Sequence, residues 1–278
     1  MTPFIYFAKS WLRFLLAIFI GGVACAQTVW LPAPGRIDIT PDYTFQTFDT
    51  YQRGATSAKT ANPVSQQTAT VNLDIGISTT VAADVTLGYS DTYLLATAVP
   101  KSDTGMIDSL VGVRYRFLPT LALRVGAIIQ GTYTQNFPFS VGDGASGVET
   151  SLLFGKTFGE SGAGTYGDFG YRHRNHAAPD GIFGSAGVYK NVRRASLSLG
   201  YRHLQSLSGP NIGDPGFIFS QVKVVSNTME FGVGIRGPHG QYYQFFTAKS
   251  VGGRNVGHKT IIGVATTFNF RPAKIHVQ

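Results

Sequence analysis

Arginine side chains are concentrated in one part of this 278-residue sequence, where Arg114 and Arg116 flank Tyr115 and Arg124 follows soon after. A guanidinium group binds carboxylates through paired hydrogen bonds and stacks on aromatic rings. If these three side chains line a cavity without acidic partners, they favour anionic or aromatic ligands. If acidic side chains lie opposite them, the charges neutralise one another and brace a wall. The sequence leaves both interpretations open, and we single out these three arginines as the best candidates for an uncompensated patch.

The elements that position these arginines are predicted by a strict alternation of residue types. In the stretch 111–117 the odd positions are apolar or aromatic and the even positions are Gly or Arg. Residues 71–77, 121–130 and 197–202 alternate in the same way. A period of two indicates β-strands with one apolar and one polar face, so the arginines share the polar face.

Repeated alternation predicts an all-β fold of about 12 strands. Short connections, such as 119–120 and 192–193, alternate with longer ones, such as 135–147 and 205–221. Short turns at one end and long loops at the other indicate a transmembrane antiparallel up-and-down β-barrel. The expected strands lie near residues 36–48, 67–78, 83–97, 105–118, 121–134, 148–158, 164–175, 182–191, 194–205, 222–236, 241–250 and 258–270.

A soluble β-sandwich is the alternative fold, because its strands also alternate. Its water-facing surface would carry more charge than a chain with only 14% charged residues provides. Aromatic side chains also gather near the expected strand ends, which is typical of the two interfaces of a membrane. These aromatic residues are Tyr43, Tyr89, Tyr93, Tyr133, Tyr171, Tyr201 and Phe270.

If the apolar face of each strand meets lipid, the charged residues of opposite parity point into the barrel. An arginine facing lipid at mid-membrane would cost about 2–4 kcal/mol, which favours the same assignment. Arginine outnumbers acidic residues on this face, so a basic lumen is expected. The candidates for lining the pore are Asp74, Asp84, Asp108, Arg114, Arg116, Arg124, Asp168, Arg172, Arg174, Arg194, Arg202, Glu230 and Arg236.

Glycine recurs on the inward parity as well. These glycines either leave gaps through which a solute passes or relieve the curvature of a closed sheet, and we favour the second interpretation. They are Gly76, Gly88, Gly112, Gly126, Gly170, Gly200, Gly232 and Gly234.

The N-terminal segment predicts export. Residues 1–26 carry Lys9 and Arg13 ahead of a short apolar stretch, and they form a signal peptide cleaved between Ala26 and Gln27. A lipidated Cys25 is the alternative. No later stretch reaches the roughly 18 apolar residues of a transmembrane helix. The predicted organisation is therefore a signal peptide (1–26), a barrel (27–270) and a C-terminal tail (271–278).

Catalytic chemistry finds little support in the sequence. The pattern G-x-G-x-x-G occurs at Gly142, Gly162 and Gly232, but it opens no predicted helix. We therefore expect no cofactor, no metal ion and no enzymatic activity. A membrane hydrolase remains an alternative, because His173 and His203 lie near expected loops with Ser206 and Ser208 close by. A structural or adhesive barrel is another alternative.

The order of segments resembles the MetA-pathway of phenol degradation family. The matching stretches include residues 34–38 leading into Tyr43-Thr44-Phe45, residues 74–78, residues 105–116 leading into residues 121–126, and residues 199–202. The resemblance implies an outer-membrane barrel that passes small, often aromatic or apolar, compounds. One departure is the tail 271–278, which follows the terminal aromatic Phe270.

These observations together predict a passive channel in the outer membrane of a Gram-negative cell. A basic exported protein, with a formal net charge of +8 for the whole chain, meets lipids rather than nucleic acid. The expected partners are outer-membrane lipids, the outer-membrane assembly machinery and a small aromatic or anionic solute. The sequence leaves open whether loop 52–65, 135–147 or 205–221 folds inward as a plug.

Overall fold

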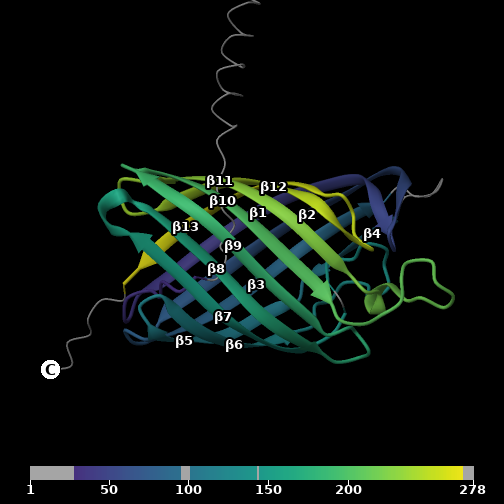
Figure 1. Cartoon of the computed structure of the whole chain (residues 1–278), viewed down its shortest axis with the longest axis horizontal. Coiled ribbons are helices and arrows are strands. Elements are labelled where there is room, and N and C mark those ends of the chain that lie inside the picture. The colour runs from purple at the N-terminus through teal and green to yellow at the C-terminus, as the bar shows by residue number, and fades with distance from the viewer. Residues whose placement is uncertain (1–27, 95–100, 143, 272–278) are drawn as a thin grey trace, which may run out of the picture.

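The computed structural model describes residues 28–94, 101–142 and 144–271. Its strands form a barrel and are inclined to the barrel's long axis (Figure 1). The predicted signal peptide, with Cys25 and the Ala26–Gln27 cleavage site, lies outside the described residues, as does the tail beyond Arg271. Two single-turn 3-10 helices, η1 (Gly159–Ser161) and η2 (Phe219–Gln221), lie in connections. The strands are β1 (Ile37–Arg53), β2 (Thr56–Gly76), β3 (Val81–Leu94), β4 (Lys101–Met106), β5 (Ser109–Leu118), β6 (Leu121–Ile129), β7 (Gly147–Phe158), β8 (Ala163–Arg174), β9 (Gly181–Val192), β10 (Ala195–Ser206), β11 (Val225–Arg236), β12 (Tyr242–Arg254) and β13 (Thr260–Phe270).

The sheet closes on itself. Each strand pairs antiparallel with its neighbours, and β1 pairs with β13 from Ile37 opposite Phe270 to Thr47 opposite Thr260. Strands β4 and β5 occupy one place in the wall, because both pair with β3 along different halves of its length. The predicted closed antiparallel barrel with 12 strand positions is thereby confirmed. We call its two ends the turn end and the loop end.

The outer surface of the barrel is apolar. Val113, Val125 and Ile262 are each at least half exposed, at 51%, 50% and 60%. The residues next to them in each strand, which include Arg114 and Arg124, are buried inside. Apolar side chains thus lie outside and charged ones inside, the reverse of a water-soluble protein. Such a large apolar surface is unfavourable in water and matches lipid.

No helix among the described residues has the length and hydropathy needed to cross a membrane.

Strands β1 and β2 extend beyond the rest of the wall at the loop end. Only Gly54 and Ala55 separate them, so the loop expected at 52–65 is wrong for most of its length. Pairing continues to Arg53 opposite Thr56, after an irregularity between Phe48 and Thr50. The sequence of this extension lacks the apolar–polar alternation on which the prediction relied.

The strand expected at 105–118 is broken at Ile107 and Asp108. Residues 89–94 of β3 pair with β4, and residues 81–86 pair with β5. The break shifts the side-chain parity: odd positions such as Asp103 are buried in β4, whereas even positions such as Arg114 are buried in β5. A bulge of this kind turns the intervening Asp108 into the barrel.

Inward glycines lie beneath flat side chains of neighbouring positions. A Cβ atom at Gly112 or Gly126 would come within about 3 Å of the Arg124 guanidinium, and one at Gly170 would lie 2.4 Å from the Phe183 ring. These three glycines are therefore covered by side chains and open no gap in the wall. They let the backbone approach large side chains that lie flat against the wall.

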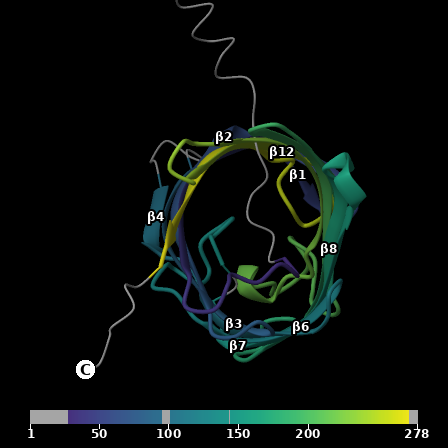
Figure 2. The same ribbon diagram turned by 90° about the vertical axis from the view of Figure 1, so that its left-hand side faces the viewer.

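Two long loops enter the barrel at the loop end. The loop after β6 and the loop carrying η2 both lie within the ring of strands (Figure 2). Phe139 of the first loop packs edge-to-face against Phe48 and Tyr51 of β1, with ring centroids 4.9 Å and 5.3 Å apart. It also contacts Phe219 of η2 at 6.4 Å. Tyr133, expected among the lipid-facing aromatics, is instead 5% exposed and belongs to this inward loop, because β6 ends at Ile129.

Asn255 fastens the loop-end elements to one another. Its Oδ1 accepts hydrogen bonds from the backbone N–H of Gly54 (2.7 Å) and of Ile212 (3.0 Å). Its Nδ2 donates to the carbonyl of Lys223 (2.7 Å) and to Oδ1 of Asn211 (3.2 Å). The backbone φ of +52° at Asn255 is one that asparagine tolerates better than most residues. One side chain thus joins the β1–β2 turn, the loop 207–224 and the β12–β13 connection.

We predict that Asn255→Ala loosens the loop 207–224 without unfolding the barrel. Leaving buried N–H and C=O groups unpaired costs about 1–3 kcal/mol, so cleavage of this loop under limited proteolysis should accelerate at least about tenfold. Asn227→Ala removes a similarly bonded asparagine from the outer face and serves as the matched control. Equal cleavage rates in the two variants would contradict the role assigned to Asn255.

Candidate functional site

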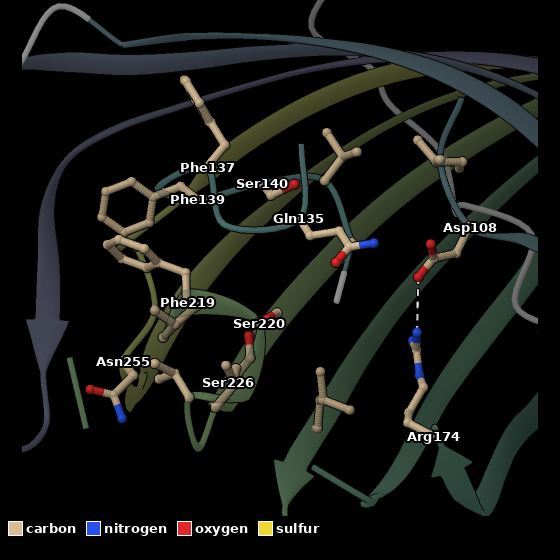
Figure 3. A pocket seen from close by; sticks show the side chains of 18 of the residues that line it. Asp108, Gln135, Phe137, Phe139, Ser140, Arg174, Phe219, Ser220, Ser226 and Asn255 are labelled. Carbon is tan, nitrogen blue, oxygen red and sulfur yellow. Dashed lines mark hydrogen bonds and ion pairs between the residues drawn. The ribbon is translucent and has the colours of Figure 1, made fainter. Parts of the chain in front are cut away.

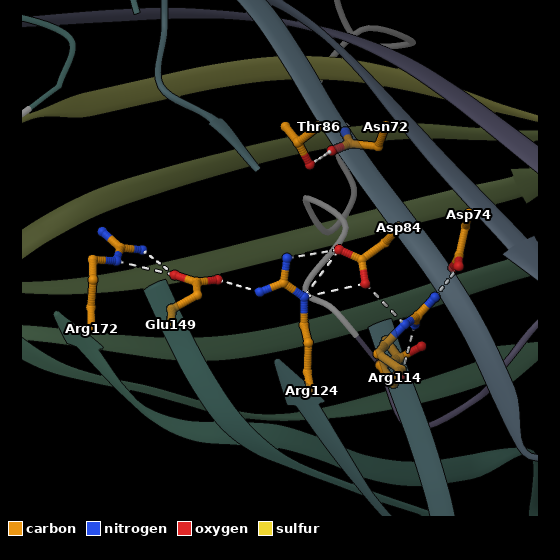
Figure 4. A network of polar contacts seen from close by, with 9 residues as sticks. Asn72, Asp74, Asp84, Thr86, Arg114, Arg124, Glu149 and Arg172 are labelled. Atoms are coloured by element: carbon orange, nitrogen blue, oxygen red, sulfur yellow. Dashed lines mark hydrogen bonds and ion pairs between the residues drawn. The ribbon is translucent and has the colours of Figure 1, made fainter. Parts of the chain in front are cut away.

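Charged side chains on adjacent strands form a continuous series across the inner wall (Figure 4). The series passes from β2 to β8, and acids and arginines alternate along most of it. We call it the charge ladder, and its members are Asp74, Asp84, Arg114, Arg124, Glu149 and Arg172.

Arg124 is the centre of the charge ladder and is fully buried. Its Nε lies 3.0 Å and its Nη2 2.7 Å from Oδ2 of Asp84. Its Nη1 donates to Oε1 of Glu149, whose other oxygen accepts from Nη2 of Arg172 at 2.9 Å. Arg114 continues the ladder in the other direction, pairing with Asp74 and lying 3.5 Å from Asp84.

The idea that Arg114, Arg116 and Arg124 form an uncompensated patch is therefore wrong. Arg114 and Arg124 are both neutralised by carboxylates, and Arg116 lies apart at the turn end, where it donates to the carbonyl of Thr79 at 2.5 Å. Three arginines face three carboxylates, so the charge ladder is neutral. Cross-strand bracing describes these contacts.

Sequence reasoning overlooked Glu149, which joins two arginines. Its strand β7 alternates only weakly, with Thr150 facing outward and Leu153 buried inside. The count of inward acids was accordingly too low. Leu152 and Phe154 face outward, so alternate residues of the strand, including Glu149, must face inward. This rule would have identified Glu149.

The other pore-lining candidates are spread over the loop end, the middle and the turn end of the barrel. Arg174 pairs with Asp108 at 2.9 Å, and Asp168 accepts a hydrogen bond from Ser185. Arg202 contacts Glu230 at 3.4 Å and stays 47% exposed. The remaining two candidates, Arg194 and Arg236, are exposed at the turn end, where the backbone N–H of Arg236 donates to the carbonyl of Arg194.

The segment that precedes β1 lies inside the barrel at the turn end (Figure 2). Val29 is fully buried against Ala122 and Leu153. The Trp30 ring packs edge-to-face on Tyr189 at 5.7 Å. Nη1 of Arg114 donates to the carbonyl of Thr28 at 3.0 Å, so the charge ladder also holds this segment. We call residues 28–36 the lumenal segment. The alternation pattern predicts no element for residues 28–35, and the expected strand at 36–48 begins one residue later, at Ile37.

Three cavities follow one another through the interior. The loop-end cavity has a volume of about 390 Å³, the middle cavity about 370 Å³ and the turn-end cavity about 400 Å³. The loop-end and middle cavities share Leu110, Arg172 and Leu204 in their walls. The middle and turn-end cavities share Asn72 and Thr86. Adjacent cavities therefore border the same wall residues, and the three lie in series along the barrel.

The two histidines proposed for a hydrolase have other partners. Nδ1 of His173 lies 2.9 Å from Asp180, and Nδ1 of His203 lies 2.7 Å from Oδ1 of Asn227. Hydrogen bonds from Tyr171, the Arg174 backbone and His173 hold the pKa of the Asp180 carboxyl below its usual value. Within the described ranges, no serine hydroxyl forms a hydrogen bond with either imidazole, and no cluster of His, Cys, Asp and Glu could hold a metal ion.

We predict that Arg124→Met destabilises the barrel by about 3–5 kcal/mol, because the buried carboxylates of Asp84 and Glu149 lose their shared partner. Urea-induced unfolding in phospholipid vesicles measures this change. Arg202→Met removes a half-exposed arginine with one long contact and should cost at most about 1 kcal/mol. If the two variants unfold at the same urea concentration, the charge ladder does not stabilise the wall as described.

Comparison with solved structures identifies the architecture. A COG4313 outer membrane channel from Pseudomonas putida F1 superimposes with a TM-score of 0.66 at 12% identity, covering 89% of this chain and 100% of that chain. The translocator domain of the autotransporter NalP from Neisseria meningitidis gives a TM-score of 0.51 at 12% identity, covering 87% and 90%. No protein-family model and no curated protein sequence matches. The chain therefore has the fold of an outer-membrane β-barrel, and its resemblance to the MetA-pathway of phenol degradation family stays a prediction.

Proposed function

We propose that this protein is an outer-membrane channel through which small solutes diffuse passively. The observation that carries the proposal is the series of three cavities joined by shared wall residues from one end of the barrel to the other. The apolar outer surface of the barrel, which we call the apolar belt, supports an outer-membrane location. The short turns at one end and long loops at the other support the same location. In such a channel, solutes move down their own gradient.

The walls of the route favour solutes with an aromatic or anionic part. Trp30, Tyr166, Tyr189 and Tyr242 border the turn-end cavity and present ring faces and hydroxyl groups. Arg172 stands where the loop-end and middle cavities meet. The family resemblance, which implies small aromatic or apolar compounds, agrees with this composition. Because the charge ladder is neutral, we expect weak ion selectivity rather than the strong anion preference that unpaired arginines would give.

Two further partners belong to this proposal. The apolar belt fits outer-membrane lipids, and β13 ends in alternating outward residues up to Phe270, a pattern that suits recognition by the outer-membrane assembly machinery. The signal peptide would bring the chain to that machinery. None of these features calls for a nucleic acid or a cofactor.

The lumenal segment should limit the flow of ions. We predict that a refolded chain beginning at Gly35 conducts several-fold more current in a planar bilayer than a chain beginning at Thr28, because residues 28–34 occupy the turn end of the route. Arg116→Gln, at the rim of the same end, is the control for a change of local charge alone. Equal conductance of the long and short chains would show that this segment does not restrict the route. Silent bilayers from both folded chains would reject the channel.

A further inference from the structure

The loop-end cavity has an apolar part, where Phe137, Phe139 and Phe219 lie near one another, and a polar part that includes Asp108 and Arg174 (Figure 3). The wall strands and the two inward loops contribute its apolar surface, including Leu110, Ile128, Phe137, Phe139 and Phe219. A volume of about 390 Å³ lies within the range of small-ligand sites. A cavity of this composition accommodates an apolar body rather than a strongly hydrated ion.

Three cationic side chains border this cavity, and two of them already have acidic partners. Arg174 pairs with Asp108, as Figure 3 shows. Arg172 pairs with Glu149 and stacks over the Phe183 ring at 5.4 Å. Within the part of the chain that the structure describes, the Lys259 ammonium has neither a hydrogen bond nor an ion pair. Among the described residues, Lys259 is therefore the cationic side chain of this cavity that has no acidic partner.

The backbone holds Lys259 at the cavity wall. Its carbonyl accepts a hydrogen bond from the N–H of Ser250 at 2.9 Å, and its own N–H donates to the carbonyl of Gly257 at 2.9 Å. The next residue, Thr260, is exposed on the outer face, so the alternation of side chains directs Lys259 inward. The half-buried side chain borders the cavity, and its position is fixed by the strand ends on either side.

An ammonium group in apolar surroundings lacks the solvation that water would give it. Burial lowers the pKa of Lys259, and among the described residues no carboxylate pairs with its ammonium group. A ligand that brings its own negative charge supplies the missing counter-ion, and its apolar part gains contact with the phenylalanine side chains. A cationic ligand is less favoured, because the carboxylate of Asp108 in the cavity wall is already paired with Arg174.

We propose that the loop-end cavity is a binding site for an amphiphilic monoanion, with its carboxylate at Lys259 and its apolar body among Phe137, Phe139 and Phe219. The site accommodates a ligand with one negative charge because, among the described residues, Lys259 is the one cation of its lining without an acidic partner. This inference rests on the proposed function and names the class of solute that the channel would admit. Binding at the loop end would select such solutes before they reach the middle cavity.

Isothermal titration calorimetry of the full barrel in nanodiscs, with empty nanodiscs subtracted, tests the site. The probes are 4-phenylbutyrate and its uncharged isostere 4-phenylbutanamide. We expect the carboxylate to bind at least about tenfold more tightly than the amide, because a hydrogen bond between two charged groups is stronger than one to a neutral group. Lys259→Met should abolish that difference, and Lys259→Arg should preserve most of it.

Lys249→Met is the matched control, because Lys249 is an exposed lysine on the outer face of β12. It should bind both probes as the unaltered protein does. Equal binding of the two probes by the unaltered protein, or an undiminished preference in Lys259→Met, would overturn the proposal. Conductance separates this result from the proposed function: a silent bilayer with intact carboxylate preference rejects the channel alone, and an open channel without that preference rejects the site alone.

Discussion

Closure of the sheet between β1 and β13 is the constraint on which the other features depend. In lipid, an unpaired strand edge leaves backbone N–H and C=O groups without partners, and each such group costs several kcal/mol. Pairing along nine positions of β1 and β13 removes that edge. Closure also divides the side chains into two sets, because alternate residues must face either lipid or the interior. The apolar belt and the polar lumen are both consequences of that division.

The interior is too polar to be packed as an ordinary hydrophobic core. Buried hydrophobic clusters are small, such as Val29 with Ala122 and Leu153. The charge ladder takes the place of a core on the wall from β2 to β8, and Arg124 is its centre. A buried arginine is tolerable there because Asp84 and Glu149 both accept its hydrogen bonds. Glycines at 112 and 126 make room for the guanidinium to lie flat on the backbone.

The space that remains is shaped by segments that do not belong to the wall. The lumenal segment occupies the turn end, and its attachment to the charge ladder through Thr28 links wall stability to the width of the route. At the loop end, Phe139 and η2 form an apolar lining, and Asn255 holds the surrounding loops in place. The interior thus has a loop end with an apolar lining, a charged middle and an aromatic turn end that the lumenal segment partly occupies.

The amino-acid sequence by itself determined the strands and the direction in which most side chains point. The alternation around Arg114, for example, reflects a local rule of the extended backbone, so it needs no knowledge of distant residues. The same rule failed where the sequence of a strand does not alternate, as in the extension of β1 and β2, and where a predicted strand is interrupted, as at residues 107–108. Only the tertiary structure decided which charges meet. Asp84, Arg124 and Glu149 come from three strands, and their pairing depends on the register between those strands. The position of the lumenal segment was likewise fixed by contacts between residues far apart in the chain.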